Sequence, residues 1–513
     1  MSKRIPLQQV DDSGSMYVSE AKIHPREVNG RFTRLRTAAV WWLLGMYYLF
    51  PWLTWDGRQA VLFDLPARKF YLFGLNFWPQ DFFFLALLLI MAGLSLFFFT
   101  ALAGRLWCGY ACPQTVWTEV FVWIERFFEG DRHKRIKLDA SPWHREKILR
   151  RGGKHVAWVL FALWTGFTFV GFFTPIRDLG ARLYPFEWGG WETFWVLFYA
   201  LATWGNAGFL REQVCKYMCP YARFQSAMFD RNTLLIAYDE RRGEPRGARK
   251  RGSLASVLER ARGLLPPAAA RAAQVHAAHE EMERGGVRIT TGLIDLPEDQ
   301  RPTVNSPEDL GDCIDCTLCV QVCPTGIDIR NGLQYECIAC GACIDACDGV
   351  MDRLSYPRGL IRYTTQNAVD GKPSRILRPR VVIYGVLLLA LFTGWTWGVL
   401  NRAPLQVDVL RDRNALYRTA ADGAVENAYT LRIINKQPRA HTYRIAVEGE
   451  GAITLVGAPI DIHAAAEEVL TVPVTLRGEP GRVAGRHDVR FVVESLDDPA
   501  VRSTHDTRFF GPM

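Results

Sequence analysis

The sequence from residue 313 to residue 347 is CIDCTLCVQVCPTGIDIRNGLQYECIACGACIDAC, and it contains the spacing C-x2-C-x2-C-x3-C twice. Three closely spaced thiolates can bind one face of an iron–sulfur cube, whereas the fourth ligand has to come from a distant point of the chain. Two such runs in one short segment are typical of a bacterial two-cluster ferredoxin. The stretch therefore predicts an α+β ferredoxin-like domain with two [4Fe-4S] clusters.

The expected ligands follow from the rule that the last cysteine of each run binds the cluster of the other run. The first cluster would be bound by Cys313, Cys316, Cys319 and Cys347, and the second by Cys337, Cys340, Cys343 and Cys323. Asp348 stands where the first run has Pro324, which relaxes the loop but removes no ligand. A pair of zinc knuckles is the alternative, because C-x2-C pairs also bind zinc. The two complete runs favour clusters.

The composition indicates a membrane protein with several domains. The chain has 513 residues, of which 49% are hydrophobic, and a formal net charge of +8. None of its 12 cysteines lies outside a C-x2-C or C-x3-C pattern, so we expect a reducing compartment rather than a disulfide framework. The basic residues cluster in loops beside apolar runs, which is typical of membrane topology and not of a nucleic-acid-binding face. No nucleic-acid partner is expected.

Apolar runs predict an α-helical transmembrane bundle of about five spans. The expected spans are residues 38–53, 82–103, 155–174, 191–210 and 381–400. The loop after the second span is rich in Arg and Lys, which predicts that this loop is cytoplasmic. The N-terminus and the ferredoxin runs would then be cytoplasmic, and the chain after residue 400 would be outside.

The predicted domain order places the ferredoxin between the fourth and fifth spans. The segments are a cytoplasmic N-terminal segment (1–37), a four-span membrane domain (38–239), a linker (240–304), the ferredoxin domain (305–365), a second linker with the fifth span (366–403) and a periplasmic domain (404–513). Short β-branched stretches such as 429–434 and 469–476 predict that the last domain is an immunoglobulin-like β-sandwich. The first linker contains an alanine-rich, helix-compatible stretch (268–278), with His276 and His279 expected at the surface.

The remaining cysteines form two C-x3-C-P motifs, each of which follows a pair of predicted spans. Their cysteines are Cys108, Cys112, Cys215 and Cys219, and Pro113 and Pro220 stand directly after them. An amphipathic helix at the membrane interface is expected to begin near each proline. Because both units cross the membrane in the same sense, they would place the motifs at one depth. Cysteines four residues apart face the same way on a helix, so the four thiols are predicted to converge in a catalytic metal site.

The occupant of this second site is left open by the sequence. Four soft thiolates suit Cu(I), zinc or a third iron–sulfur cluster, whereas the plain alternative is that the cysteines pack as small apolar residues. Met218 could add a thioether ligand or simply pack. The predicted spans contain no paired histidines for membrane haems, so a haem-based quinol oxidase is not expected from this chain alone.

These motifs resemble the cytochrome c oxidase accessory protein family of the CcoG/FixG/RdxA type. The resemblance rests on both ferredoxin runs, on the segment Tyr356–Tyr363 (YPRGLIRY) and on the two C-x3-C-P motifs. It implies a polyferredoxin of the bacterial inner membrane that reduces Cu(II) to Cu(I) for assembly of cbb3-type cytochrome c oxidase. The implied partners are oxidase subunits or copper-delivery proteins, membrane lipid and an unknown electron donor.

Two other functions stay open at this point. The chain could relay electrons between a quinol or cytosolic donor and a partner reductase, or it could be a non-catalytic scaffold for oxidase assembly. No dinucleotide-binding glycine fingerprint follows a predicted strand, so the sequence does not indicate the donor.

Overall fold

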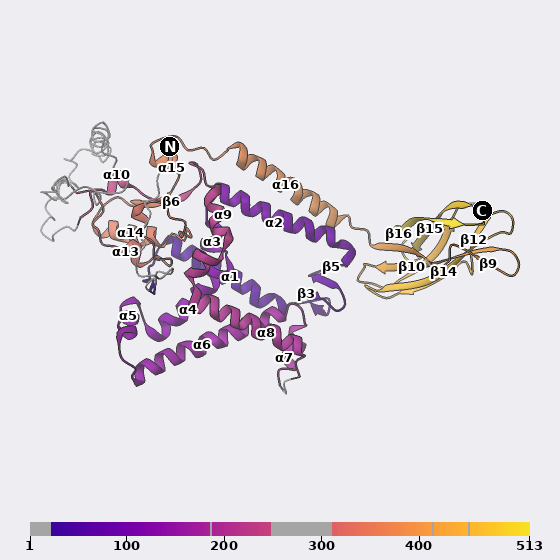
Figure 1. Cartoon of the computed structure of the whole chain (residues 1–513), viewed down its shortest axis with the longest axis horizontal. Coiled ribbons are helices and arrows are strands. Elements are labelled where there is room, and N and C mark those ends of the chain that lie inside the picture. The colour runs from indigo at the N-terminus through magenta and orange to yellow at the C-terminus, as the bar shows by residue number, and fades with distance from the viewer. Residues whose placement is uncertain (1–21, 185–186, 248–309, 413–414, 450–451, 513) are drawn as a thin grey trace, which may run out of the picture. The chain divides into compact units, whose positions relative to one another are not determined.

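The computed structural model describes residues 22–184, 187–247, 310–412, 415–449 and 452–512. The chain divides into two compact units, residues 1–391 and residues 392–513 (Figure 1). Most of the expected linker 240–304 lies outside the described residues, as do the alanine-rich stretch 268–278, His276 and His279.

The first unit contains a group of helices that carries both C-x3-C-P motifs (Figure 1). These elements are α1 (Arg31–Leu49), α2 (Phe82–Ala103), α3 (Leu106–Tyr110), α4 (Pro113–Glu129), α5 (Arg132–Ala140), α6 (Arg145–Val170), α7 (Ile176–Ala181), α8 (Gly190–Thr203), the π-helical turns η3 (Trp204–Leu210) and η4 (Val214–Met218), and α9 (Pro220–Met228). Helix α16 (Pro379–Leu400) crosses the boundary between the two units. Helices α6 and α8 pack closely at Gly166, where an added Cβ would lie 2.3 Å from the carbonyl oxygen of Val196. Small residues permit such close backbone approach between helices.

The two helices predicted to follow the motif prolines are confirmed. Helix α4 begins at Pro113 and helix α9 begins at Pro220, each with proline in its first turn. Proline suits this position because the first backbone N–H groups of a helix have no partner within the helix.

Two described helical segments, Pro79–Ala103 and Pro379–Leu400, are long and apolar enough to cross a membrane. They correspond to the second and fifth predicted spans. The other three predicted spans coincide with α1, with the C-terminal part of α6, and with α8 continued by η3. Helix α8 has only 14 residues, whereas a membrane span needs about 20. The prediction of a helical region is confirmed, and two of its described helices are candidate membrane spans.

Short strands and turns connect α1 to α2. They are η1 (Phe50–Trp52), β1 (Thr54–Trp55), β2 (Arg58–Gln59), β3 (Val61–Asp64), β4 (Lys69–Leu72), β5 (Leu75–Phe77) and η2 (Pro79–Asp81). Strands β3, β4 and β5 form an antiparallel sheet. Gln59 ties this segment to the end of α6, because its Nε2 donates to the carbonyl oxygen of Gly171 at 2.7 Å.

The ferredoxin part of the first unit is a small α+β fold. Its elements are β6 (Leu235–Tyr238), α10 (Glu240–Gly243), α13 (Leu318–Gln321), η7 (Ile329–Asn331), α14 (Ala342–Arg353), β7 (Ile361–Thr364) and α15 (Gln366–Val369). Strands β6 and β7 pair antiparallel, and their apolar residues pack with Met351 of α14 in a buried core. Strand β6 precedes the expected linker, so residues on both sides of residues 248–309 build this fold.

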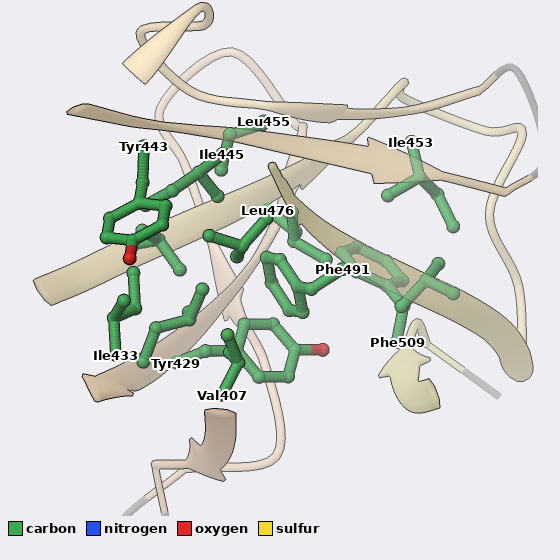
Figure 2. Close-up of a cluster of buried hydrophobic side chains, with 14 of the residues drawn as sticks. Val407, Tyr429, Ile433, Tyr443, Ile445, Ile453, Leu455, Leu476, Phe491 and Phe509 are labelled. Atoms are coloured by element: carbon green, nitrogen blue, oxygen red, sulfur yellow. The ribbon is translucent and has the colours of Figure 1, made fainter. Parts of the chain in front are cut away.

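The second unit is an immunoglobulin-like β-sandwich, as predicted. Its strands are β8 (Leu405–Arg411), β9 (Arg418–Thr419), β10 (Val425–Asn435), β11 (His441–Glu448), β12 (Ile453–Leu455), β13 (Ile460–Ala464), β14 (Val469–Gly478), β15 (Arg486–Ser495) and β16 (Arg502–Phe510). One sheet has the order β12-β14-β10-β8 with β9 beside β10, and the other has the order β13-β11-β15-β16. Figure 2 shows Tyr429, Tyr443 and Phe491 in the core between the sheets. Alternating apolar residues on each strand supply this core.

Candidate functional site

The first ferredoxin ligand set faces one cavity. Its lining includes the thiols of Cys313, Cys316, Cys319 and Cys347. Cys319 lies on the short helix α13, which follows two residues with left-handed backbone, Asp315 and Thr317. Cys347 comes from α14, so the fourth thiol of this set is supplied by the other run.

The second ferredoxin set faces a separate cavity. This cavity is lined by Cys323, Cys337, Cys340 and Cys343, and Cys319 lines it as well. Gly341, in the left-handed region with φ of 77°, begins helix α14. This turn leads the chain from Cys340 on the loop to Cys343 on the helix. The backbone path thus brings together the thiols that the cross-run rule groups.

The residues of both cavities fit iron–sulfur clusters. Burial raises the pKa of Cys319, Cys337 and Cys347 to about 12 in each case. Such thiols are protonated near neutral pH, so the binding of iron as a cluster would replace their protons. The remaining lining is mostly apolar, with side chains such as Ile236 and Ile327, and an apolar surround limits access of water to a cluster.

The four C-x3-C-P cysteines lie on α3 and η4 or within two residues after them. Cys108 lies within electrostatic range of Cys112, Cys215 and Cys219. Burial, followed by the neighbouring thiols, raises the pKa of Cys108 to about 12 and that of Cys215 to about 11. The Sγ atom of Cys108 also donates a hydrogen bond to Oε1 of Gln225 at 3.3 Å. The fold thus assembles a group of partly buried thiols from both repeat units.

Arg105 supplies a positive charge beside this thiol group. Its side chain is buried, and its guanidinium interacts with the thiols of Cys108, Cys215 and Cys337. The Nε atom of Arg105 is buried and has no hydrogen-bond partner within the described residues. An unsatisfied buried donor is costly, and an anionic sulfur site would lower this cost. Among the described residues, no three His, Cys, Asp or Glu side chains form a site for a single metal ion.

The thiol group and the second ferredoxin cavity are in direct contact. A Cβ added to Gly109 of α3 would lie 2.8 Å from the carbonyl oxygen of Ile338 and 2.9 Å from that of Ala339. Cys108 packs beside Ile338 and Cys340. A glycine inside the first motif allows this approach. The motif alone does not predict this contact, although a glycine inside the motif is a signal for a close backbone approach.

Helix α1 is also fixed to the second ferredoxin run. The carboxylate of Asp345, which lies between Cys343 and Cys347, accepts hydrogen bonds from the backbone N–H groups of Phe32 at 3.1 Å and Thr33 at 2.7 Å. The first N–H groups of a helix need such acceptors, and a negative charge there is favourable. Gly30 precedes the helix and offers no side-chain cap. The capping residue was therefore missed because it comes from a segment distant in sequence.

A larger cavity, of about 290 Å³, opens beside both sulfur sites. It reaches Cys215 of the second motif and Thr325, Ile338 and Ala342 of the ferredoxin, and the N-terminal segment 23–29 forms another wall. Its charged lining includes Arg36 and Arg126 paired with Glu119. A small molecule could thus approach both sites.

Three family models match the chain. The model of a 4Fe-4S binding domain matches residues 83–134, which include the first C-x3-C-P motif. The model of a 4Fe-4S dicluster domain matches residues 210–262 and 270–366, which include the second motif and both ferredoxin runs. The model of the Ig-like fold at the C-terminus of FixG matches residues 395–512.

Relatives match over most of the chain. The protein RdxB of Cereibacter sphaeroides is 38% identical, covering 97% of this chain and 98% of its own length. The nitrogen fixation protein FixG of Rhizobium meliloti is 37% identical, covering 86% of this chain and 82% of its own. A crystal structure of a FixG-related protein from Vibrio parahaemolyticus matches 21% of this chain and 98% of its own, with 28% identity and a TM-score of 0.20. The chain therefore belongs to the FixG/RdxA/RdxB family of iron–sulfur proteins, with 4Fe-4S binding domains and the FixG C-terminal Ig-like domain.

Proposed function

We propose that the protein is a membrane-bound oxidoreductase that carries electrons through its ferredoxin to the C-x3-C-P thiols, where Cu(II) is reduced to Cu(I) for assembly of a cbb3-type cytochrome c oxidase. The observation that carries this proposal is the contact of Gly109 with the carbonyl groups of Ile338 and Ala339. It places the thiol group directly against the loop between Cys337 and Cys340, so the two sulfur sites are neighbours.

The eight ferredoxin cysteines are proposed as ligands of two clusters. Cys313, Cys316, Cys319 and Cys347 would hold the first, and Cys323, Cys337, Cys340 and Cys343 the second. When bound, such clusters supply one-electron redox chemistry. Cys316 is the exposed member of the first set, so we assign electron entry to that side. The second set includes Cys340, which packs near Cys108, so this set lies on the side of the C-x3-C-P thiols.

The copper step needs one electron and one thiol group. A low-potential donor on the cytoplasmic side gives one electron to the ferredoxin, and Cu(II) takes up that electron to become Cu(I). Soft thiolates prefer Cu(I), so Cys108, Cys112, Cys215 and Cys219 would hold the product. Each thiol that binds releases its proton. Oxidase subunits or copper-delivery proteins would then accept the Cu(I).

We propose five membrane spans with the ferredoxin in the cytoplasm and the β-sandwich in the periplasm of a bacterial inner membrane. Besides the two apolar helices, α1, α6 and α8 also expose large apolar side chains, such as Trp41 at 69%, Leu160 at 61% and Trp191 at 76%. Water disfavours so much exposed apolar surface, whereas lipid accommodates it. Our proposed domain scheme divides the chain into the segments 1–37, 38–239, 240–304, 305–365, 366–403 and 404–513.

The second candidate function is electron relay to a partner reductase, with a third iron–sulfur cluster at the C-x3-C-P thiols. The match of a 4Fe-4S binding model to residues 83–134 favours this alternative, because that range contains Cys108 and Cys112. Iron and acid-labile sulfide per chain distinguish the two: eight of each indicate two clusters and twelve indicate three.

The copper proposal is tested with the anaerobically purified full-length protein. After reduction by dithionite and removal of excess reductant, added Cu(II) should reoxidise the clusters and yield one Cu(I) per electron. The double variant Cys108→Ala, Cys215→Ala should keep both ferredoxin clusters by EPR and lose this reaction. Phe224→Leu is the matched control, since Phe224 is exposed and has no metal-binding atom, and it should react like the wild type.

Three results would redirect the assignment. Undiminished Cu(II) reduction by the double variant would remove the C-x3-C-P thiols from the reaction. Reduction of the clusters by a quinol would support the relay. If no donor or acceptor changes the oxidation state of the clusters, a scaffold role would remain.

A further inference from the structure

The two ferredoxin ligand sets lie in different electrostatic surroundings. Beside the first set, Arg330 is the nearby cation, and it interacts with the thiol of Cys319. Its guanidinium is already paired with two carboxylates, those of Asp328, at 2.7 Å from Nη2, and Asp315. These pairs offset most of its charge. The first site therefore has little net positive charge around it.

Beside the second set lie two buried arginines from the helical part of the unit. Arg105 is 4% exposed and Arg36 is 9% exposed. Arg105 interacts with the thiol of Cys337, and Arg36 interacts with that of Cys340. Glu119 pairs with Arg36 at 3.3 Å, so the charge of Arg36 is partly offset.

Hydrogen bonds fix the position of Arg105. Its Nη1 donates to the carbonyl oxygen of Cys337 at 2.8 Å, and its Nη2 donates to the carbonyl oxygen of Ala222 at 2.8 Å and to Oγ of Ser226 at 2.5 Å. These acceptors are neutral and carry no compensating charge. The carboxylate of Glu336 interacts with Arg105 and offsets part of its charge. Arg105 thus joins the ferredoxin loop, α9 of the second repeat and the thiols of both motifs.

A fixed positive charge stabilises the reduced form of a neighbouring redox site, because reduction adds a negative charge. The effect is strong where the charge is buried, since salt screens buried pairs much less than exposed ones. Arg105 acts on the second ferredoxin site and on the C-x3-C-P group together. The cations near the first ferredoxin site, Arg330 and Arg246, are each paired with a carboxylate in an ion pair.

We propose that Arg105 is a positioning residue that raises the reduction potential of the second ferredoxin site above that of the first, so that the electron is held next to the C-x3-C-P thiols. This inference rests on the proposed ligand sets but not on copper as the acceptor. Arg36 adds to the same effect from the Cys340 side.

The test is an EPR-monitored redox titration of the full-length protein in detergent. The wild type should show two midpoint potentials. In Arg105→Gln the higher midpoint should become more negative by about 59 mV, which is a tenfold change for a one-electron couple, and the lower midpoint should stay in place. Arg105→Lys should restore part of the shift. Arg223→Gln is the matched control, because Arg223 is an exposed cation on α9, and it should shift neither midpoint.

Arg36→Gln gives a second, independent reading if Arg105→Gln fails to assemble. It too should lower the higher midpoint alone. An unchanged higher midpoint in a variant that retains both clusters would overturn the proposal, and so would an equal shift of both midpoints. The readout contains no copper. If the higher midpoint potential shifts in the variants but the protein does not reduce Cu(II), the role of Arg105 stands and Cu(II) is rejected as the acceptor.

Discussion

The two C-x3-C-P units have a similar backbone conformation at one position where their sequences differ. Gly104 and Arg211 each stand four residues before the first cysteine of their motif. Gly104 has φ of 55° and ψ of −110°, and Arg211 has φ of 37° and ψ of −110°. This region is strained for any residue except glycine, at a cost of about 1–3 kcal/mol. The second unit thus tolerates strain that the first avoids.

Arg211 is held in this conformation by its side chain. Its Nε donates to the carbonyl oxygen of Gly208 at 2.9 Å, and its Nη2 lies 2.7 Å from Oε2 of Glu125. Glu125 is fully buried on α4, the helix that follows the first motif. The strained residue therefore ties the second unit to the first.

The units also differ inside the motifs. Gly109 of the first motif corresponds to Lys216 of the second, and the glycine lies close to the carbonyl groups of Ile338 and Ala339. The comparison indicates a division of roles. The first unit carries the ferredoxin, and the second is anchored to the first through a buried charge.

Replacing Glu125, which joins the two units, should cause the largest loss of stability. In the wild type, Arg211, Arg135 and Lys154 all lie within 3.9 Å of the Glu125 carboxylate. Glu125→Gln leaves these three cations facing a neutral side chain. Removing one partner of a buried ion pair costs about 3–5 kcal/mol. Thermal unfolding in detergent measures the loss.

Glu146→Gln is the control for this variant. Glu146 is exposed and pairs with Arg150 one helical turn away, so its loss should cost less than about 0.5 kcal/mol. Equal stability losses for Glu125→Gln and Glu146→Gln would mean that the buried charge does not join the units.

Adding one methyl group to the first motif should have the next largest effect. Gly109→Ala places a Cβ 2.8 Å from a backbone oxygen that cannot move aside easily, and such overpacking costs about 1–3 kcal/mol. Hydrogen exchange of the loop 337–343 should become faster. Gly152→Ala, on α6 with open space around it, should leave that loop unchanged. If both variants exchange alike, the ferredoxin does not rest on Gly109.

Much of this arrangement could be predicted from the sequence. Cysteine spacing predicted the ferredoxin region, Pro113 and Pro220 marked the starts of their helices, and β-branched stretches predicted the sandwich. These features depend on local patterns. The cap of α1 by Asp345 and the contact of Arg105 with Cys337 could not be predicted in this way. Each joins segments separated by more than 200 residues, and no local periodicity records such pairs.

The shared backbone conformation can be tested in the first unit by Gly104→Ala. A side chain at φ of 55° is strained, and its Cβ would lie 2.8 Å from Cδ2 of Leu235. We expect a loss of about 2 kcal/mol in the free energy of unfolding. An unchanged unfolding free energy would show that position 104 does not need the glycine conformation.

Cysteine alkylation tests the surroundings that both units share. Burial raises the pKa of Cys108 and of Cys215 above that of a free thiol, and the thiolate is the nucleophile. In the metal-free protein both cysteines should therefore be alkylated more slowly than the same cysteines of the unfolded chain, and both rates should rise with pH. Mass spectrometry of the alkylated peptides measures both rates. Alkylation of Cys108 and Cys215 at the rate of the unfolded chain would contradict the prediction.

The smallest effect is expected when Arg211→Gly is introduced into the Glu125→Gln protein. In the wild type this change removes strain but also removes a buried ion pair, so it should destabilise the protein. In the Glu125→Gln protein the ion pair is already lost. There Arg211→Gly relieves about 1–3 kcal/mol of strain, which outweighs the loss of the hydrogen bond to Gly208, worth about 1 kcal/mol. The double variant should then be more stable than Glu125→Gln alone by about 1 kcal/mol, as a double-mutant cycle would measure. If Arg211→Gly destabilises both backgrounds equally, the ion pair with Glu125 does not hold the strained backbone, and the two units share their conformation for some other reason.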